Sequence, residues 1–229
     1  MDNEFRKIEV FGDSILKGIQ LNPENKKYVI DNHIDIELLS RKHEVEIINS
    51  SKFGCTIGKG RMLLERCLSK NIKIDAVVME YGGNDCDYNW KEVAEDPDKD
   101  HFPNTPLEVF VKTYKEMIEF LKKKGIQPIL TNLPPIDPQR FFDWFCNGLN
   151  KDNVLRWLGS INLIYRHQET YSRAIEKIAQ ETGCPLVDLR GAFLERQRIE
   201  NLLCEDGIHP NTEGQKVITK AFSEFKTEF

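Results

Sequence analysis

Short apolar runs alternate along this chain of 229 residues with longer stretches in which apolar residues recur every three or four positions. Five of the runs are too short to form helices, and most are rich in valine and isoleucine, as the buried strands of parallel sheets are. They occupy residues 8–11, 45–48, 76–79, 129–131 and 186–189. We therefore predict five strands with helices between them.

Three stretches predict long helices with one apolar face, and they cover residues 107–121, 161–178 and 217–225. A capping box is predicted at the start of the first helix from Thr105 and Glu108, with Pro106 at the first helical position. Thr212 and Gln215 predict another capping box before the last helix. Strands that alternate with helices imply right-handed crossovers and an α/β fold with a parallel sheet covered on both faces.

No internal repeat or linker divides the chain, so we expect a single domain over residues 1–229. Two connections are unusually long, at residues 86–104 and 133–159, and the second should be a long loop or lid insertion. Its aromatic residues suit a substrate-facing lid, an oligomer contact or a satellite core. They are Phe141, Phe142, Trp144, Phe145 and Trp157.

Composition narrows the range of partners. The net charge of −5, from 32 basic and 37 acidic residues, argues against nucleic acid, which usually needs a basic face. We find no export signal and no apolar stretch long enough for a bilayer, so the expected location is cytoplasmic, with no membrane partner. The six cysteines form no CxxC pair and the histidines lack metal-ligand spacing, so we expect packing residues and no metal.

Polar segments follow the predicted strands directly. Gly12, Asp13 and Ser14 follow the first run, residues 49–54 the second and residues 82–85 the third, while Asp206 and His209 precede the last helix. Functional sites of parallel sheets lie at the carboxyl ends of the strands. We therefore expect these four segments to converge on one rim.

Ser14 is the candidate nucleophile, and a serine hydroxyl needs a base to take its proton. Asp206, three residues before His209, can bind the imidazole Nδ1–H and leave Nε2 free to face the serine. A helix is expected directly after Ser14, with its N-terminus towards the developing oxyanion. The alternative interpretations are that Asp13 or Ser14 merely caps that helix and that residues 206–209 form a polar loop.

Three groups are candidate oxyanion donors: the backbone N–H of Ser14, the backbone N–H of Gly54 and the side-chain amide of Asn84. Gly54 also lacks a Cβ, which would let a substrate approach closely. Taken singly, Gly54 and Asn84 are equally well explained as turn residues.

In this order, the four segments resemble the sequence blocks of the SGNH (GDSL-type) hydrolase family. FGDS at 11–14, NSSKFGCT at 49–56, GGND at 82–85 and DGIHPN at 206–211 are similar to its first, second, third and fifth blocks. The resemblance implies a flavodoxin-like, three-layer α/β/α sandwich whose five strands have the order 2-1-3-4-5. It also implies an acyl-serine mechanism without cofactor or metal.

Carried onto this chain, the resemblance makes Ser14 the nucleophile, His209 the base and Asp206 the residue that orients it. Gly54 and Asn84 become oxyanion donors together with the Ser14 N–H. Asp13 and Asp85 become structural residues.

The expected function is hydrolysis of small-molecule carboxylic esters, with short acyl or acetyl groups, including those on carbohydrates, because no long acyl channel is evident. Thioesterase and lysophospholipase activities remain open within the family. A non-catalytic flavodoxin-like ligand-binding domain is the alternative of another class. No GxSxG, GxGxxG or GxxxxGK[ST] motif occurs, which disfavours the α/β-hydrolase elbow and nucleotide binding, and GDSILKG after the first strand disfavours FMN.

Overall fold

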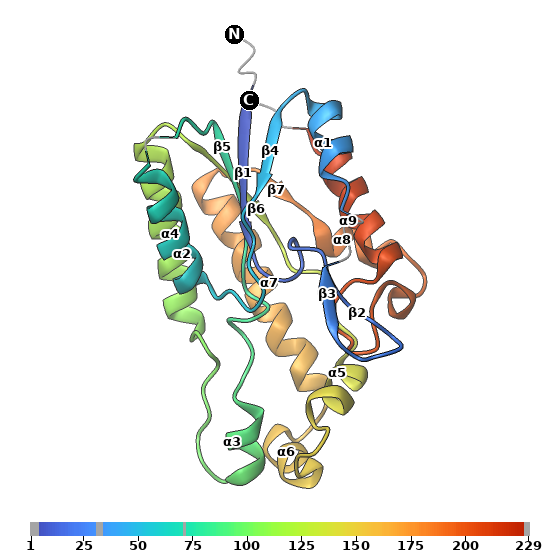
Figure 1. Cartoon of the computed structure of the whole chain (residues 1–229). Coiled ribbons are helices and arrows are strands. Elements are labelled where there is room, and N and C mark those ends of the chain that lie inside the picture. The colour runs from blue at the N-terminus through green and yellow to red at the C-terminus, as the bar shows by residue number, and fades with distance from the viewer. Residues whose placement is uncertain (1–4, 31–33, 71, 227–229) are drawn as a thin grey trace.

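The computed structural model describes residues 5–30, 34–70 and 72–226. Its main sheet has five parallel strands in the order β4-β1-β5-β6-β7 (Figure 1). Their bounds are β1 Lys7–Gly12, β4 Glu46–Asn49, β5 Ala76–Glu80, β6 Gln127–Thr131 and β7 Leu186–Val187. Counted among themselves these strands run 2-1-3-4-5, which confirms the predicted order.

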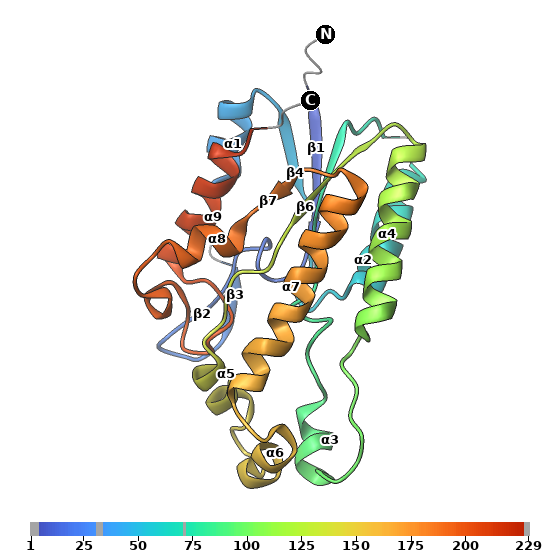
Figure 2. The same ribbon diagram turned by 180° about the vertical axis from the view of Figure 1, so that it is seen from behind.

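Helices cover both faces of the sheet, which confirms the three-layer α/β/α architecture (Figures 1 and 2). One face carries α2 Ile57–Leu68, α4 Leu107–Lys123 and α7 Asn162–Thr182. The other carries α1 Ile36–His43, α8 Leu189–Leu194 and α9 Thr212–Glu224. Among the described residues, no helix has the length and apolarity required to cross a bilayer.

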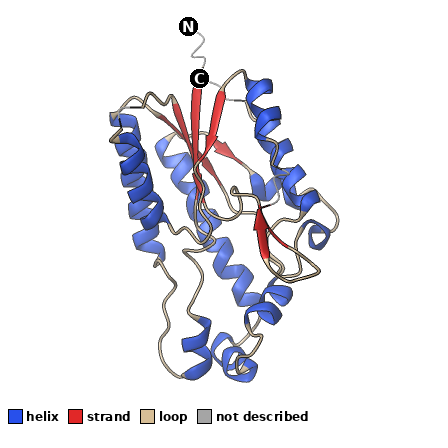
Figure 3. Cartoon of the chain, viewed as in Figure 1, coloured by secondary structure: helices blue, strands red, loops and turns tan. Residues whose placement is uncertain are grey.

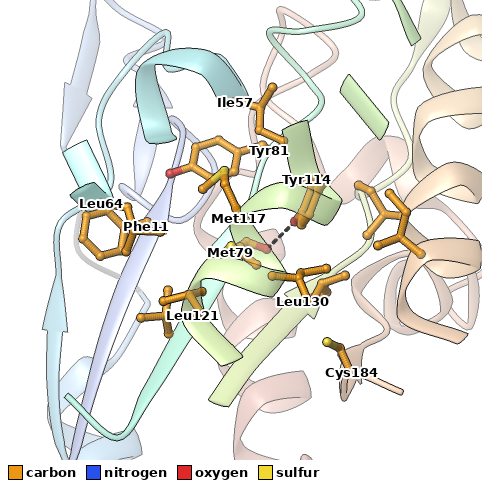
Figure 4. Close-up of a cluster of buried hydrophobic side chains, with 14 of the residues drawn as sticks. Phe11, Ile57, Leu64, Met79, Tyr81, Tyr114, Met117, Leu121, Leu130 and Cys184 are labelled. Carbon is orange, nitrogen blue, oxygen red and sulfur yellow. Dashed lines mark hydrogen bonds between the residues drawn. The ribbon is translucent and has the colours of Figure 1, made fainter. Parts of the chain in front are cut away.

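Side-chain alternation in the strands fills both layers. In β5, Val77 and Met79 belong to the core beneath α2, α4 and α7, whereas Ala76 and Val78 face the core beneath α8 and α9. Figure 4 shows the first of these cores, in which the Tyr114 hydroxyl donates to the Met79 carbonyl oxygen at 2.9 Å. Each large apolar side chain buried there contributes about 1.5–3 kcal/mol of transfer free energy.

The last strand is shorter than its apolar run predicted. Leu189 is the first residue of α8, because the Asp188 side chain accepts the Gly191 backbone N–H and caps that helix. Residues 188–189 therefore leave the strand.

Both predicted capping boxes are wrong. Pro106 is the N-cap residue of α4 and makes no side-chain cap bond, while the Thr105 backbone N–H donates to the Asp85 carbonyl oxygen. For α9 the cap is Asn211, whose side chain accepts the backbone N–H groups of Glu213 and Gly214 at 3.0 and 3.1 Å. A capping box needs the Ser or Thr to sit one residue before the helix, and neither threonine does.

The helix expected after Ser14 is also wrong. Residues 14–18 form one turn, and the chain then enters a hairpin of β2 Ile19–Leu21 and β3 Tyr28–Ile30, outside the main sheet (Figure 3). Gly18 adopts φ +74°, a left-handed conformation that ends helical geometry. The Ile19 N–H then returns to the Ser14 carbonyl oxygen at 3.0 Å.

The two long connections contain helices rather than irregular loop. These are α3 Trp90–Glu95 in the first connection and α5 Pro138–Phe145 and α6 Lys151–Leu158 in the second, and the 3-10 helix η1 Ile199–Leu202 precedes the last polar segment. Asp137 and Asn150 cap α5 and α6, signals that the aromatic composition of this stretch concealed. The inserted helices lie beyond the carboxyl edge of the sheet (Figure 1).

Aromatic and aliphatic side chains of these helices form a third apolar cluster. Phe142 is buried in it, and Phe141, Phe145 and Trp157 pack against it, so the satellite-core interpretation holds for these four residues. Phe141, Phe145 and Trp157 also border the cavity described below, together with Trp144.

Candidate active site

The carboxyl edge of the sheet brings Ser14, His209 and Asp206 into one hydrogen-bonded chain. The Ser14 Oγ lies 2.9 Å from the His209 Nε2, although the two residues are 195 positions apart. The His209 Nδ1 lies 2.6 Å from Oδ2 of Asp206. Ser14 is 7% exposed, His209 4% and Asp206 0%, so bulk water competes little with these contacts.

Backbone contacts hold the Asp206 carboxylate in place. Its Oδ1 accepts the backbone N–H groups of Ile208 and His209, both at 3.1 Å. Gly207, between Asp206 and Ile208, adopts φ +75°, and a Cβ there would lie 2.6 Å from the Asp137 carbonyl oxygen. This position therefore requires glycine for its backbone conformation and for space.

The environment of Asp206 keeps its carboxyl group ionised. Burial raises its pKa, but hydrogen bonds and the charge interaction with His209 outweigh burial and leave the pKa lowered. An ionised carboxylate can only accept, so Nδ1 of His209 carries a proton and Nε2 can accept one from the Ser14 hydroxyl. The arrangement can therefore deprotonate Ser14.

The three predicted oxyanion donors line one cavity. The Asn84 Nδ2 donates to Oδ2 of Asp13 at 2.8 Å, and Oδ1 of Asp13 accepts the Ile15 backbone N–H at 2.8 Å. One of the two Nδ2 hydrogens is thereby fixed and the other remains for a ligand. Gly54 has φ +66°, a left-handed conformation that favours glycine, and no atom of a described residue beyond its chain neighbours lies within 4 Å of the point where a Cβ would stand.

Glu80 is a buried residue of this site that the sequence interpretation missed. Its Oε2 accepts the Asp13 backbone N–H at 3.0 Å, and its carboxyl group contacts that of Asp13. Burial and the Asp13 charge raise the pKa of Glu80 well above its usual value, whereas Asp13 shows a smaller rise, caused by burial. We therefore place the proton on Glu80 and the charge on Asp13. The available signal was an acidic residue within an otherwise apolar strand.

Asp85 joins two of the four segments. Its carboxylate oxygens lie 3.0 and 3.1 Å from the Ile57 backbone N at the start of α2, and its carbonyl oxygen accepts the Thr105 N–H. Burial raises the pKa of Asp85 to about 6, against hydrogen bonds that lower it. This contact anchors the segment that carries Gly54 to the one that carries Asn84.

A cavity of about 380 Å³ opens at Ser14 and extends beneath the inserted helices. In the part of the chain that the structure describes, no three His, Cys, Asp or Glu side chains are placed to hold a metal ion.

Comparison with known proteins places this geometry in a family. The sequence model of the GDSL-like lipase/acylhydrolase family matches residues 10–217, which include all four polar segments. The chain belongs to the GDSL-like lipase/acylhydrolase family. The predicted resemblance to GDSL-type hydrolases is thereby confirmed.

Individual proteins resemble this chain at low sequence identity, one in sequence and two in fold. A GDSL esterase/lipase from Arabidopsis thaliana is 22% identical over 187 residues, which cover 80% of this chain but only 66% of that relative. A lipase/acylhydrolase from Enterococcus faecalis superposes with a TM-score of 0.66 at 20% identity, covering 95% of this chain and 93% of that one. An acetylxylan esterase from Geobacillus stearothermophilus gives 0.67 at 19% identity, covering 96% and 95%. Family membership supports a hydrolase that acts on esters.

Proposed function

We propose that this chain is a serine ester hydrolase that works through an acyl-serine intermediate. The observation that carries the proposal is the 2.9 Å contact between the Ser14 Oγ and the Nε2 of a histidine whose other nitrogen is bound to a buried carboxylate. Such a base converts a weak hydroxyl nucleophile into an effective one. A domain that only binds ligands has no need of this arrangement.

In the first half-reaction, the Ser14 Oγ forms a bond to the ester carbonyl carbon while His209 takes the hydroxyl proton. The Asp206 carboxylate stabilises the resulting imidazolium. Negative charge develops on the carbonyl oxygen, where the N–H groups of Ser14 and Gly54 and the Asn84 amide can donate to it.

The intermediate then collapses as the bond to the alcohol oxygen breaks and His209 returns its proton to that oxygen. A water molecule repeats the attack on the acyl-serine, His209 takes a proton from that water, and Ser14 regains its hydrogen from His209 as the carboxylic acid leaves. The complete cycle therefore consumes one water molecule, and Ser14 and His209 end in their starting protonation states.

Acetyl and other short acyl esters, including acetylated carbohydrates, are the first substrates that we propose. Support comes from the fold shared with an acetylxylan esterase. Thioesters and lysophospholipids would use the same acyl-serine chemistry. Both belong in the same substrate panel.

Initial rates on p-nitrophenyl acetate test the proposal in wild type, Ser14→Ala and the matched control Ser69→Ala, which removes an exposed hydroxyl at the end of α2. We expect Ser14→Ala to lower kcat by about 10⁴-fold or more, with Ser69→Ala unchanged. A fluorophosphonate probe should add one adduct mass to wild type and none to Ser14→Ala. Equal rates in all three proteins would exclude the serine mechanism.

A further inference from the structure

The cavity at Ser14 is much larger than an acetyl group requires. Its volume of about 380 Å³ falls within the range of sites for small organic molecules, about 300–1,000 Å³. It begins between Ser14 and Asn84 and reaches Leu158 of α6 and Ile164 of α7. An acetyl group alone would leave most of this space without a contact.

Beneath the inserted helices the cavity is walled mostly by apolar side chains, and Asp87, His167 and Gln168 are the polar residues among them. Trp90 of α3, Ile136 before α5, Leu158 and Ile164 are each less than 10% exposed and belong to the third apolar cluster. The ring of Trp90 stacks on Phe145, with centroids 4.1 Å apart. These walls are packed as a core is packed, so the cavity exists before any ligand arrives. They favour an apolar occupant.

The direction of proton transfer assigns the two halves of the ester. His209 must return its proton to the leaving alcohol, so the alcohol lies on the His209 side. The rings of Tyr28 and Phe53 border that side, with centroids 4.9 and 6.1 Å from the imidazole, and they are 37% and 55% exposed. This side is an open aromatic surface, which suits an alcohol that extends into solvent.

With the alcohol on the His209 side, the rest of the cavity, which Asn84 also lines, is available to the acyl group. Cys86, Tyr88 and Trp90 follow this oxyanion donor closely in sequence, and all three line the cavity. Once the alcohol occupies the His209 side, the part of the cavity beneath the inserted helices is the space left for the acyl group.

Resting on the proposed ester hydrolysis, we infer that this site takes medium-chain or aryl-bearing apolar acyl groups in the cavity walled by α3, α5 and α6, with the alcohol over Tyr28 and Phe53. Acetyl esters still react, but less efficiently. The sequence alone showed no sign of this cavity, because segments distant in sequence form it.

Chain length is the direct test, with the alcohol held constant. Each buried methylene contributes roughly fourfold to binding, so kcat/KM for p-nitrophenyl hexanoate should exceed that for the acetate by at least about tenfold. In Ile164→Trp, which fills the cavity, this ratio should fall towards one. The control Leu194→Trp alters a side chain that is 52% exposed on α8, away from the cavity, and should keep the wild-type ratio. Should Ile164→Trp fail to fold, Trp157→Ala is scored in its place and should shift the preference towards longer chains.

The outcomes separate the two proposals. Hydrolysis that depends on Ser14 but is no faster with hexanoate overturns the acyl assignment and leaves the esterase proposal standing. A hexanoate preference that survives Ile164→Trp, or a chain-length preference that Trp157→Ala leaves unchanged, also overturns it, since the acyl chain must then bind elsewhere. Hydrolysis that persists in Ser14→Ala defeats the proposed function itself. Calorimetry gives an independent measure of binding. The Ser14→Ala protein should bind p-nitrophenyl hexanoate at least about tenfold more tightly than p-nitrophenyl acetate.

Discussion

Replacing Asp206 with asparagine tests the inferred tautomer of His209 with almost no change in shape. In the native site Oδ1 accepts two backbone N–H groups, those of Ile208 and His209, while Oδ2 faces Nδ1. Asparagine has one acceptor oxygen, and the two backbone donors retain it. Its NH₂ group therefore turns towards Nδ1 and requires that nitrogen to be unprotonated. The imidazole proton moves to Nε2, where it blocks removal of the Ser14 proton.

The expected loss follows from the free energy of restoring the working tautomer. Two buried donors that face one another without acceptors cost about 2–6 kcal/mol, and the missing ionic hydrogen bond to the imidazolium costs about 1.5–3 kcal/mol more. The midpoints together are about 6 kcal/mol, which corresponds to about 10⁴-fold in kcat. The amide oxygen of the substituted side chain keeps both backbone bonds, so the loop should stay folded.

The assay measures steady-state rates on p-nitrophenyl hexanoate. Thermal unfolding followed by circular dichroism shows whether each variant is folded. The matched control is Glu205→Gln, which neutralises the neighbouring exposed carboxylate, whose side chain pairs with Lys26. We expect Asp206→Asn to lower kcat by about 10⁴-fold with a native spectrum, and Glu205→Gln to leave kcat unchanged. A kcat within tenfold of wild type in a folded Asp206→Asn protein would refute the tautomer argument.

Two other substitutions probe the groups behind the oxyanion site. Folding raises the pKa of Glu80 above its unfolded value of 4.5, so the free energy of unfolding should fall as pH rises from 4.5 through the folded pKa. Glu80→Gln should flatten this slope in urea unfolding measured between pH 5 and about pH 8. An equal slope in both proteins would show that Glu80 does not hold the extra proton. Asn84→Ala should lower kcat by about 10²–10³-fold with little change in KM, because the amide donates most strongly to the charged intermediate. A raised KM with unchanged kcat would instead make Asn84 a ground-state binding residue.

Local pattern was enough for the sheet and for the identity of the candidate site. The runs at 8–11, 45–48 and 76–79 could be recognised as strands because buried parallel strands are short and uniformly apolar. Right-handed crossovers then placed the polar residues that follow them on one edge. Order along the chain therefore sufficed to bring Ser14, Asn84 and His209 together as one hypothesis. Helix ends were predicted less well, because several caps compete within two residues.

Tertiary structure alone decided the features that depend on distant partners. The turn after Ser14 follows from the left-handed Gly18 and from pairing of β2 with β3, which no local period reveals. The raised pKa of Glu80 depends on its burial in the folded protein and then on the charge of Asp13, 67 positions away. The acyl cavity forms where α3 and α6 pack against the start of α7, so no single segment of the sequence determines its shape. Sequence indicates which groups are candidates for the chemistry, whereas packing between remote segments sets their electrostatic environment and the space available to a substrate.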